Sequence, residues 1–147
     1  MKEFWHLAVA ALAGATMALQ GTFNAALGKI IGIWPSTLMV HVIGTVTAMA
    51  AILIMKSGWV EMSKFATVPW YAYLGGVLNV LIIFAVVKTI PQVGVGNATT
   101  AIVVAQILTA LLVDALGAFG MKKYAFHYYD LLGVALLAIG ARILLMK

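Results

Sequence analysis

Six polar side chains interrupt long apolar runs of this sequence: Gln20, Asn24, His41, Asn79, Gln106 and Asp114. Gln20 and Asn24 are four residues apart, so on a helix they are neighbours on one face. Amide groups are costly in hydrocarbon and are therefore expected to face the interior of a helix bundle. There they either join helices by hydrogen bonds or line a polar cavity, and both interpretations remain open for the amides and for His41.

Two of these side chains can carry charge. Asp114 is the only acid well inside an apolar run, which makes it a candidate carrier of a proton or cation. The alternative is a structural ion pair with Arg142, Lys122 or Lys123, because Asp114 lies near the expected end of its run. His41 titrates near neutral pH in ordinary surroundings and is a candidate for proton coupling, or else it is hydrogen bonded within the bundle.

The sequence holds no catalytic constellation. It has no cysteine, and we find no serine beside a base, no paired carboxylates and no glycine-rich phosphate loop. We therefore expect a protein that is not an enzyme, with no cofactor and no metal site. The net charge of +5 is spread as single or paired lysines at segment ends, which is typical of membrane anchoring and not of nucleic-acid binding.

The composition indicates an integral membrane protein. The chain has 147 residues, of which 65% are hydrophobic and only 9% charged, and its mean hydropathy is +1.11. So few charges cannot solvate a globular domain of this length, and they fall between long apolar runs.

The apolar runs predict five membrane-spanning helices with short loops. A hydrocarbon core about 30 Å thick requires about 20 helical residues. Such runs cover roughly residues 4–31, 36–55, 69–87, 93–120 and 129–146, which we expect to form one all-α transmembrane domain over residues 1–147. The four tryptophans lie near the run ends, as in an interfacial belt: Trp5, Trp34, Trp59 and Trp70.

Small residues form a seam on the first span. Gly14, Gly21 and Gly28 fall within roughly 40° of one another on a helix. Helices in lipid associate through small residues that allow close backbone approach. The seam predicts a helix-packing surface.

The fourth span opens with a sequence that weakens helix, Pro91-Gln92-Val93-Gly94-Val95-Gly96-Asn97. One interpretation is an ordinary helix entry or hinge after a turn. The other is a partly unwound backbone that lines a polar cavity, as in transporters with broken helices.

Lysine and arginine are nearly balanced between the two sides of the membrane. With five spans, the side of the N-terminus has Lys2, Lys56, Lys64, Lys122 and Lys123, and the other side has Lys29, Lys88, Arg142 and Lys147. Orientation follows the excess of such residues, so this balance predicts insertion in both orientations. If Arg142 lies too deep to count, the remaining excess instead places the N-terminus inside.

Several motifs carry a family resemblance, in order along nearly the whole chain: GATMALQGTFNAALG, WPST, PWYAYLGG, PQVGVG, AQILTALLVDALGAFG and YYDLLGVALLAIGARIL. They resemble the YdcZ-type five-helix branch of the drug/metabolite transporter superfamily. The resemblance implies an EamA-like half-transporter of the bacterial inner membrane, whose larger relatives contain two inverted five-helix halves.

The resemblance places Gln20, Asn24, Gln106 and Asp114 at recurrent polar positions of the family, and Pro91 and Gly94 at the turn into the fourth helix. His41 and Asn79 depart from its usual small residues, so they either tune the choice of substrate or pack. Small multidrug transporters, which are distant relatives, use a glutamate in the first helix. None is present in the interior of this one, so that design is not expected unless Asp114 takes the role.

The function that we expect is export of a small molecule by an antiparallel, dual-topology dimer or by a pair with a related five-helix partner. Inverted halves around a site at the bilayer midplane are a common transporter design. The alternatives are a small dimeric channel with the same polar track and an assembly subunit whose polar residues only join helices. The neutral to weakly acidic interior suits uncharged polar solutes, amphiphiles or some cations.

Overall fold

The computed structural model describes residues 2–56 and 62–146, and within these residues every regular element is a helix. Trp59 and Lys147, which the sequence analysis names, lie outside this part. In chain order the elements are α1 (Lys2–Ile31), α2 (Ile33–Met55), α3 (Met62–Phe65), η1 (Trp70–Tyr73), α4 (Leu74–Val93), α5 (Val95–Leu116), η2 (Ala118–Gly120) and α6 (Tyr128–Leu145).

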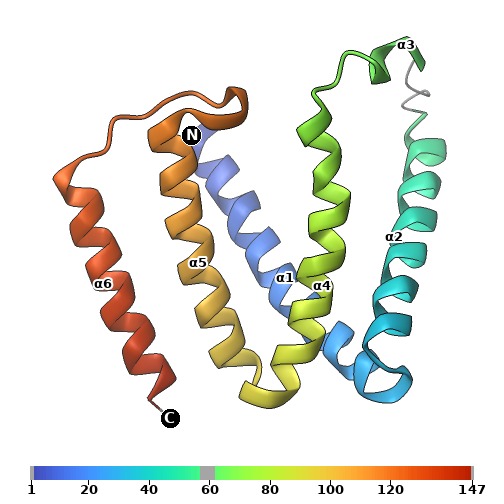
Figure 1. The fold of residues 1–147 in the computed structure, drawn as a ribbon, viewed down its shortest axis with the longest axis horizontal. Helices are drawn as coiled ribbons and strands as arrows, with labels where there is room; N and C mark the ends of the chain where they lie inside the picture. Colours follow the sequence, from blue (N-terminus) through green and yellow to red (C-terminus); the bar gives the residue numbers. More distant parts are fainter. Residues whose placement is uncertain (1, 57–61, 147) are drawn as a thin grey trace. The chain divides into compact units, whose positions relative to one another are not determined.

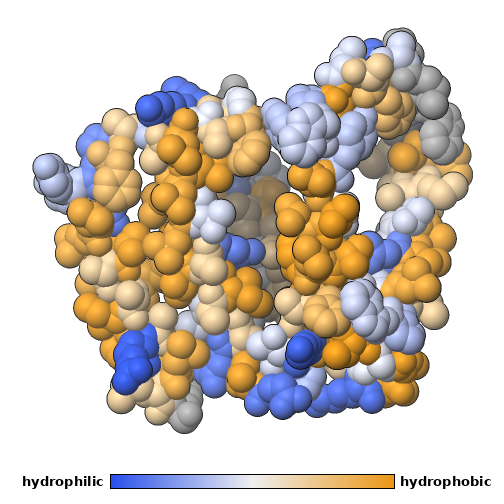
Figure 2. Space-filling view, in the orientation of Figure 1, coloured by the Kyte–Doolittle hydropathy of each residue, from blue (hydrophilic) through white to orange (hydrophobic). Residues whose placement is uncertain are grey.

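Five segments are long and apolar enough to cross a membrane: Phe4–Ile31, Ile33–Met55, Trp70–Val93, Val95–Leu116 and Tyr128–Leu145. Figure 2 shows apolar side chains over the middle of the helices that face the viewer, with hydrophilic side chains gathered mainly at helix ends. The predicted all-α fold with five spans is therefore confirmed.

Two span boundaries differ from the sequence-based ones. The third span continues to Val93 instead of ending near residue 87, so Pro91 lies in the last turn of α4 and not at the entry to the next helix. A proline there removes one backbone hydrogen bond, and the helix continues for only two more residues. The fourth span ends at Leu116 because Gly117 is left-handed (φ 61°) and its N–H bonds the Asp114 carbonyl at 3.3 Å.

The expected irregular stretch at residues 91–97 reduces to one residue. Gly94 has φ 83° and ψ 159° and separates α4 from α5, while Gly96 and Asn97 lie in the first turn of α5. A positive φ is readily adopted by glycine alone. The backbone change is thus a helix break at a single glycine.

The chain divides into two compact units, Met1–Gln92 and Val93–Lys147, which we call unit 1 and unit 2. Unit 1 contains α1, α2, α3, η1 and nearly all of α4, and unit 2 contains α5, η2 and α6.

In unit 1 the chain reverses direction at a single residue. Gly32, with φ 90°, lies between α1 and α2; its N–H bonds the Gly28 carbonyl at 3.0 Å, and its own carbonyl accepts the Ser36 N–H at 3.1 Å. The α2 helix then runs to the segment that contains α3, from which α4 returns (Figure 1). The buried apolar side chains of the unit are Ala25, Ile83, Val87 and Ile90.

In unit 2, α5 and α6 lie side by side and run in opposite directions, with the connecting segment across one end (Figure 1). The segment folds back onto α5, where the Tyr124 N–H bonds the Asp114 carbonyl at 3.0 Å. At the start of α6 the His127 N–H donates to Asp130 Oδ2 at 2.7 Å. This bond satisfies a backbone donor at the helix N-terminus, where a carboxylate is also favoured by the helix dipole.

Candidate functional site

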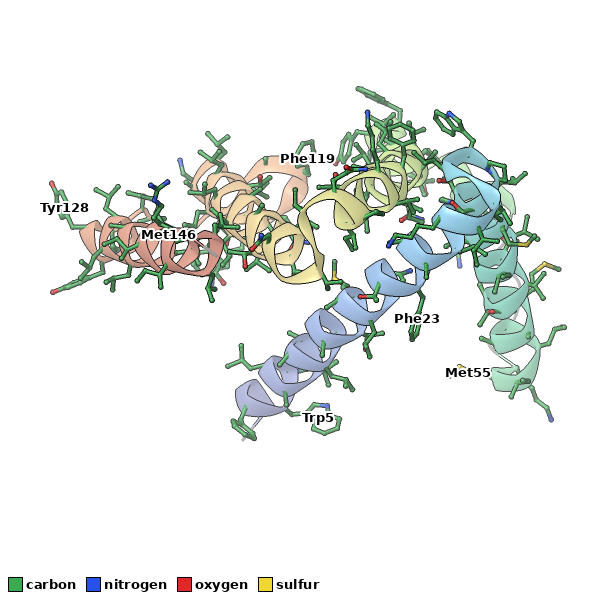
Figure 3. All side chains as sticks on the ribbon, turned by 90° about the horizontal axis from the view of Figure 1, so that it is seen from below. Trp5, Phe23, Met55, Phe119, Tyr128 and Met146 are labelled. Atoms are coloured by element: carbon green, nitrogen blue, oxygen red, sulfur yellow. The ribbon has the colours of Figure 1, made fainter. Side chains whose placement is uncertain are left out.

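The structure separates the two amides of α1. Asn24 is 7% exposed, whereas Gln20 is exposed. The two side chains are about 40° apart around the helix axis, and Asn24 is the one closer to Gly21 and Gly28. On the other side of α1, Phe23 is 67% exposed and projects away from the helix (Figure 3). Only one face of α1 is therefore covered.

Glycines make that covered face possible. A Cβ at Gly28 would overlap Val87 Cγ1 of α4, and a Cβ at Gly21 would lie 3.2 Å from Ile90 Cδ1. A Cβ at Gly14 would have no neighbouring atom within 4 Å. Two of the three seam glycines thus lie where α1 meets α4, and the third does not.

The Asn24 amide is buried without a hydrogen bond to any described residue. Buried amides normally have a partner, because leaving one unpaired costs about 1–3 kcal/mol. No side-chain nitrogen or oxygen in the described part is both fully enclosed and unpaired, so the Asn24 amide remains reachable by a small polar group. It is a candidate to bind water or a solute.

His41 and Asn79 join two helices of unit 1. Asn79 Nδ2 lies 3.1 Å from His41 Nε2, and His41 Nδ1 lies 2.7 Å from the Thr37 carbonyl oxygen one turn earlier on α2. A carbonyl only accepts, so Nδ1 carries the proton in this arrangement, and Nε2 accepts the Asn79 N–H. In this arrangement the ring carries one proton and is linked to α4.

This pair lies near the middle of its helices. His41 is three residues from Gly44, the midpoint of α2, or about 4.5 Å along the axis. Asn79 is equally near the middle of the span Trp70–Val93. His41 is partly buried and Asn79 is exposed, so one side of the pair is not covered by unit 1. Substrate and coupling-ion sites of transporters lie at this depth.

Several threonine hydroxyls in the spans bond the backbone of their own helix. Thr16, Thr22, Thr45, Thr100 and Thr109 each donate to the carbonyl four residues earlier, at 2.8–2.9 Å. Such bonds leave no demand on a neighbouring helix. Gln106 is exposed on α5 and Asn97 is partly buried, and neither side chain bonds a described residue.

Asp114 lies in unit 2, two residues before the end of α5, and its side chain is exposed. It forms no ion pair within 4.0 Å with Arg142, Lys122 or Lys123. It lines a pocket of about 290 Å³ together with Leu111, Ala115, Tyr124, Ala125, Phe126, His127 and Asp130.

Sequence reasoning did not identify Asp130 and His127 as neighbours of Asp114. It assigned Asp130 only to the first turn of the last span, which is where the structure has it. The pocket exists because the irregular segment after Gly117 folds back to bond the Asp114 carbonyl, and no local pattern in the sequence signals that return. In the sequence, Asp130 three residues after His127 indicates only that a helix begins there.

No group of three or more His, Cys, Asp or Glu side chains able to hold a metal occurs in residues 2–56 and 62–146.

The chain is matched from residue 5 to residue 143 by the model of one family, DMT_YdcZ, described as "Putative inner membrane exporter, YdcZ". Neither a curated protein nor a solved structure matches the chain. With five helices able to span a membrane and a family match over nearly its whole length, the chain belongs to the YdcZ family of inner membrane exporters.

Proposed function

We propose that two copies of this chain, inserted in opposite orientations, form one exporter that moves a small polar or amphiphilic molecule by alternating access. The observation that carries the proposal is the charge balance across an odd number of spans. In unit 1, Lys56 and Lys64 follow the end of α2, while Lys29 and Lys88 lie near the opposite ends of α1 and α4. Counting Lys2 from the sequence, one end of the unit has three such residues and the other has two, so the excess that would direct insertion is a single charge.

In unit 2, Lys122 and Lys123 lie in the segment between α5 and α6, and Arg142 lies in the last turn of α6. With Lys147, which follows α6 in the sequence, each side of the unit has two such residues. An antiparallel pair of such chains supplies the two inverted halves that alternating access requires. The exposed amides of Gln20, Asn79 and Gln106 support this proposal, because polar groups at membrane depth need cover from protein or a water-filled cavity.

Orientation is tested with two matched single cysteines, since the natural chain has none. Met121→Cys lies between α5 and α6, and Met146→Cys follows α6, so the two positions lie at opposite ends of that helix. Both methionines are exposed. In spheroplasts, a membrane-impermeant maleimide should label part of each population. Complete labelling of one variant with none of the other would contradict opposite insertion.

Carrier action is tested with purified protein in liposomes, using ethidium as a cationic probe and lactose as a neutral one. Alternating access predicts flux of a transported probe that saturates with concentration and is accelerated by unlabelled probe on the opposite side. Flux that rises in proportion to concentration without such exchange would instead indicate a channel.

A further inference from the structure

We propose that His41 binds the proton that drives this exporter and that this proton breaks the hydrogen bond from α4 to His41. The inference rests on the proposed function, because a coupling proton requires a carrier. Nothing in the family description assigns a role to His41 or Asn79.

Position singles out His41. Among the described titratable side chains, His6 lies in the first turns of α1, and Lys29, Lys88, Asp114 and Arg142 lie toward helix ends. In the five membrane-spanning helices, His41 is the described titratable residue that lies within a turn of the helix midpoint. Histidine is also the side chain whose ordinary titration falls in the physiological range.

The hydrogen bonds make the link sensitive to a proton. Nδ1 already donates to the Thr37 carbonyl, so the one free lone pair of the ring is on Nε2, which accepts the Asn79 N–H. A proton that binds Nε2 occupies that lone pair and turns the nitrogen into a donor. Two donors then face each other, and Asn79 must rotate its amide to offer oxygen or move away.

No other charged group among residues 2–56 and 62–146 bonds the pair. Lys56, just after α2, is about four turns from His41, and on α4 Lys88 lies 5.9 Å over the Phe84 ring. Tyr73, before α4, donates its hydroxyl to the Phe65 carbonyl, and Lys29 lies at the far end of α1. The His41 ring bonds Thr37 and Asn79 and no other described residue.

The exposure of the pair decides whether a proton can reach His41. An imidazolium in hydrocarbon is costly unless water or protein dipoles solvate it. His41 is only partly buried and Asn79 is exposed, so the pair opens on one side of unit 1 and is not sealed in its core. A proton that changes how α4 is held to α2 biases the carrier toward one of its two conformations.

The first test needs no substrate. The protein has three histidines and three asparagines, so ¹⁵N labelling of these residues in lipid bilayers gives few signals, which His41→Gln, His6→Gln and Asn79→Leu assign. Between about pH 8 and about pH 5, we expect His41 Nε2 to become protonated and the Asn79 side-chain amide signal to change with the same midpoint. A His41 ring that stays neutral throughout, or an Asn79 signal that does not follow it, would overturn the proposal.

The second test joins the proton to transport. In liposomes, an imposed pH gradient should accelerate ethidium flux in the wild type and in His6→Gln, the matched histidine control, and this acceleration should be lost in His41→Gln. Proton coupling through His41 would be overturned if the pH gradient did not change the wild-type flux, or if it still accelerated the flux of His41→Gln. Neither result would contradict the proposed exporter function. If flux neither saturates nor shows exchange with unlabelled probe, the proposed function itself is wrong. The ¹⁵N titration would then still test whether His41 binds a proton.

Discussion

Unit 1 and unit 2 bring their helices together in different ways. In unit 1, α1 approaches α4 at Gly21 and Gly28, and the His41–Asn79 bond joins α2 to α4. In unit 2, the described polar bonds that hold α5 near α6 lie in the connecting segment, at Tyr124 and His127. Close side-chain packing therefore positions the midspan polar groups of unit 1, while a loop positions the carboxylates of unit 2.

The difference matters for function. A polar pair held between two helices near the bilayer midplane responds when those helices move. The pocket at Asp114 and Asp130 lies at the end of α5 and the start of α6, so it is determined mainly by the conformation of the loop. We expect substitutions at helix contacts to affect unit 1 most and substitutions at helix caps to affect unit 2.

The largest expected effect is in unit 1. Gly28→Ala places a Cβ against Val87 Cγ1, and overpacking of this kind costs about 1–3 kcal/mol. The control is Gly14→Ala, where no atom lies within 4 Å. All four tryptophans belong to unit 1, so thermal unfolding in detergent followed by tryptophan fluorescence reports on it. Equal midpoints for the two variants would show that α1 does not depend on this contact.

The next effect is expected at the residue between α4 and α5. Gly94→Ala puts a Cβ on a residue with φ 83° and ψ 159°, a conformation that only glycine adopts readily and that costs another residue about 1–3 kcal/mol. Gly96→Ala is the matched control, because Gly96 is helical and has no neighbour within 4 Å. The midpoint of thermal unfolding should fall for Gly94→Ala and be unchanged or slightly higher for Gly96→Ala. The reverse order would mean that the turn is not made by Gly94.

The smallest effect concerns unit 2. Asp130→Ala removes the acceptor of the His127 N–H, and the loss of a capping interaction costs about 0.5–2 kcal/mol, toward the lower end at an exposed site. Asp114→Ala removes a carboxylate that bonds no described residue, so it should leave stability unchanged. Hydrogen exchange at the first turn of α6 should be faster only in Asp130→Ala. Equal exchange rates in the two variants would show that the cap does not hold the helix start.

Local patterns were sufficient for much of the fold. The number of spans, their helical character and the charge balance follow from apolar runs about 20 residues long and the charges between them. Span ends were less predictable: the sequence predicts Pro91 at the entry or hinge of the fourth helix, but the structure has it in the last turn of α4. A proline is tolerated so close to a helix end because few bonds follow it.

What the sequence determined by itself was therefore a chain of five membrane helices that carries amides, a histidine and an acid at membrane depth. Only the tertiary structure decided how these groups are used: Asn24 is covered while Gln20 is not, His41 meets an asparagine 38 residues away, and Asp114 shares a pocket with Asp130. Hydropathy is a sum over neighbours in the chain, whereas these pairings depend on which helix face is covered and on where a loop returns.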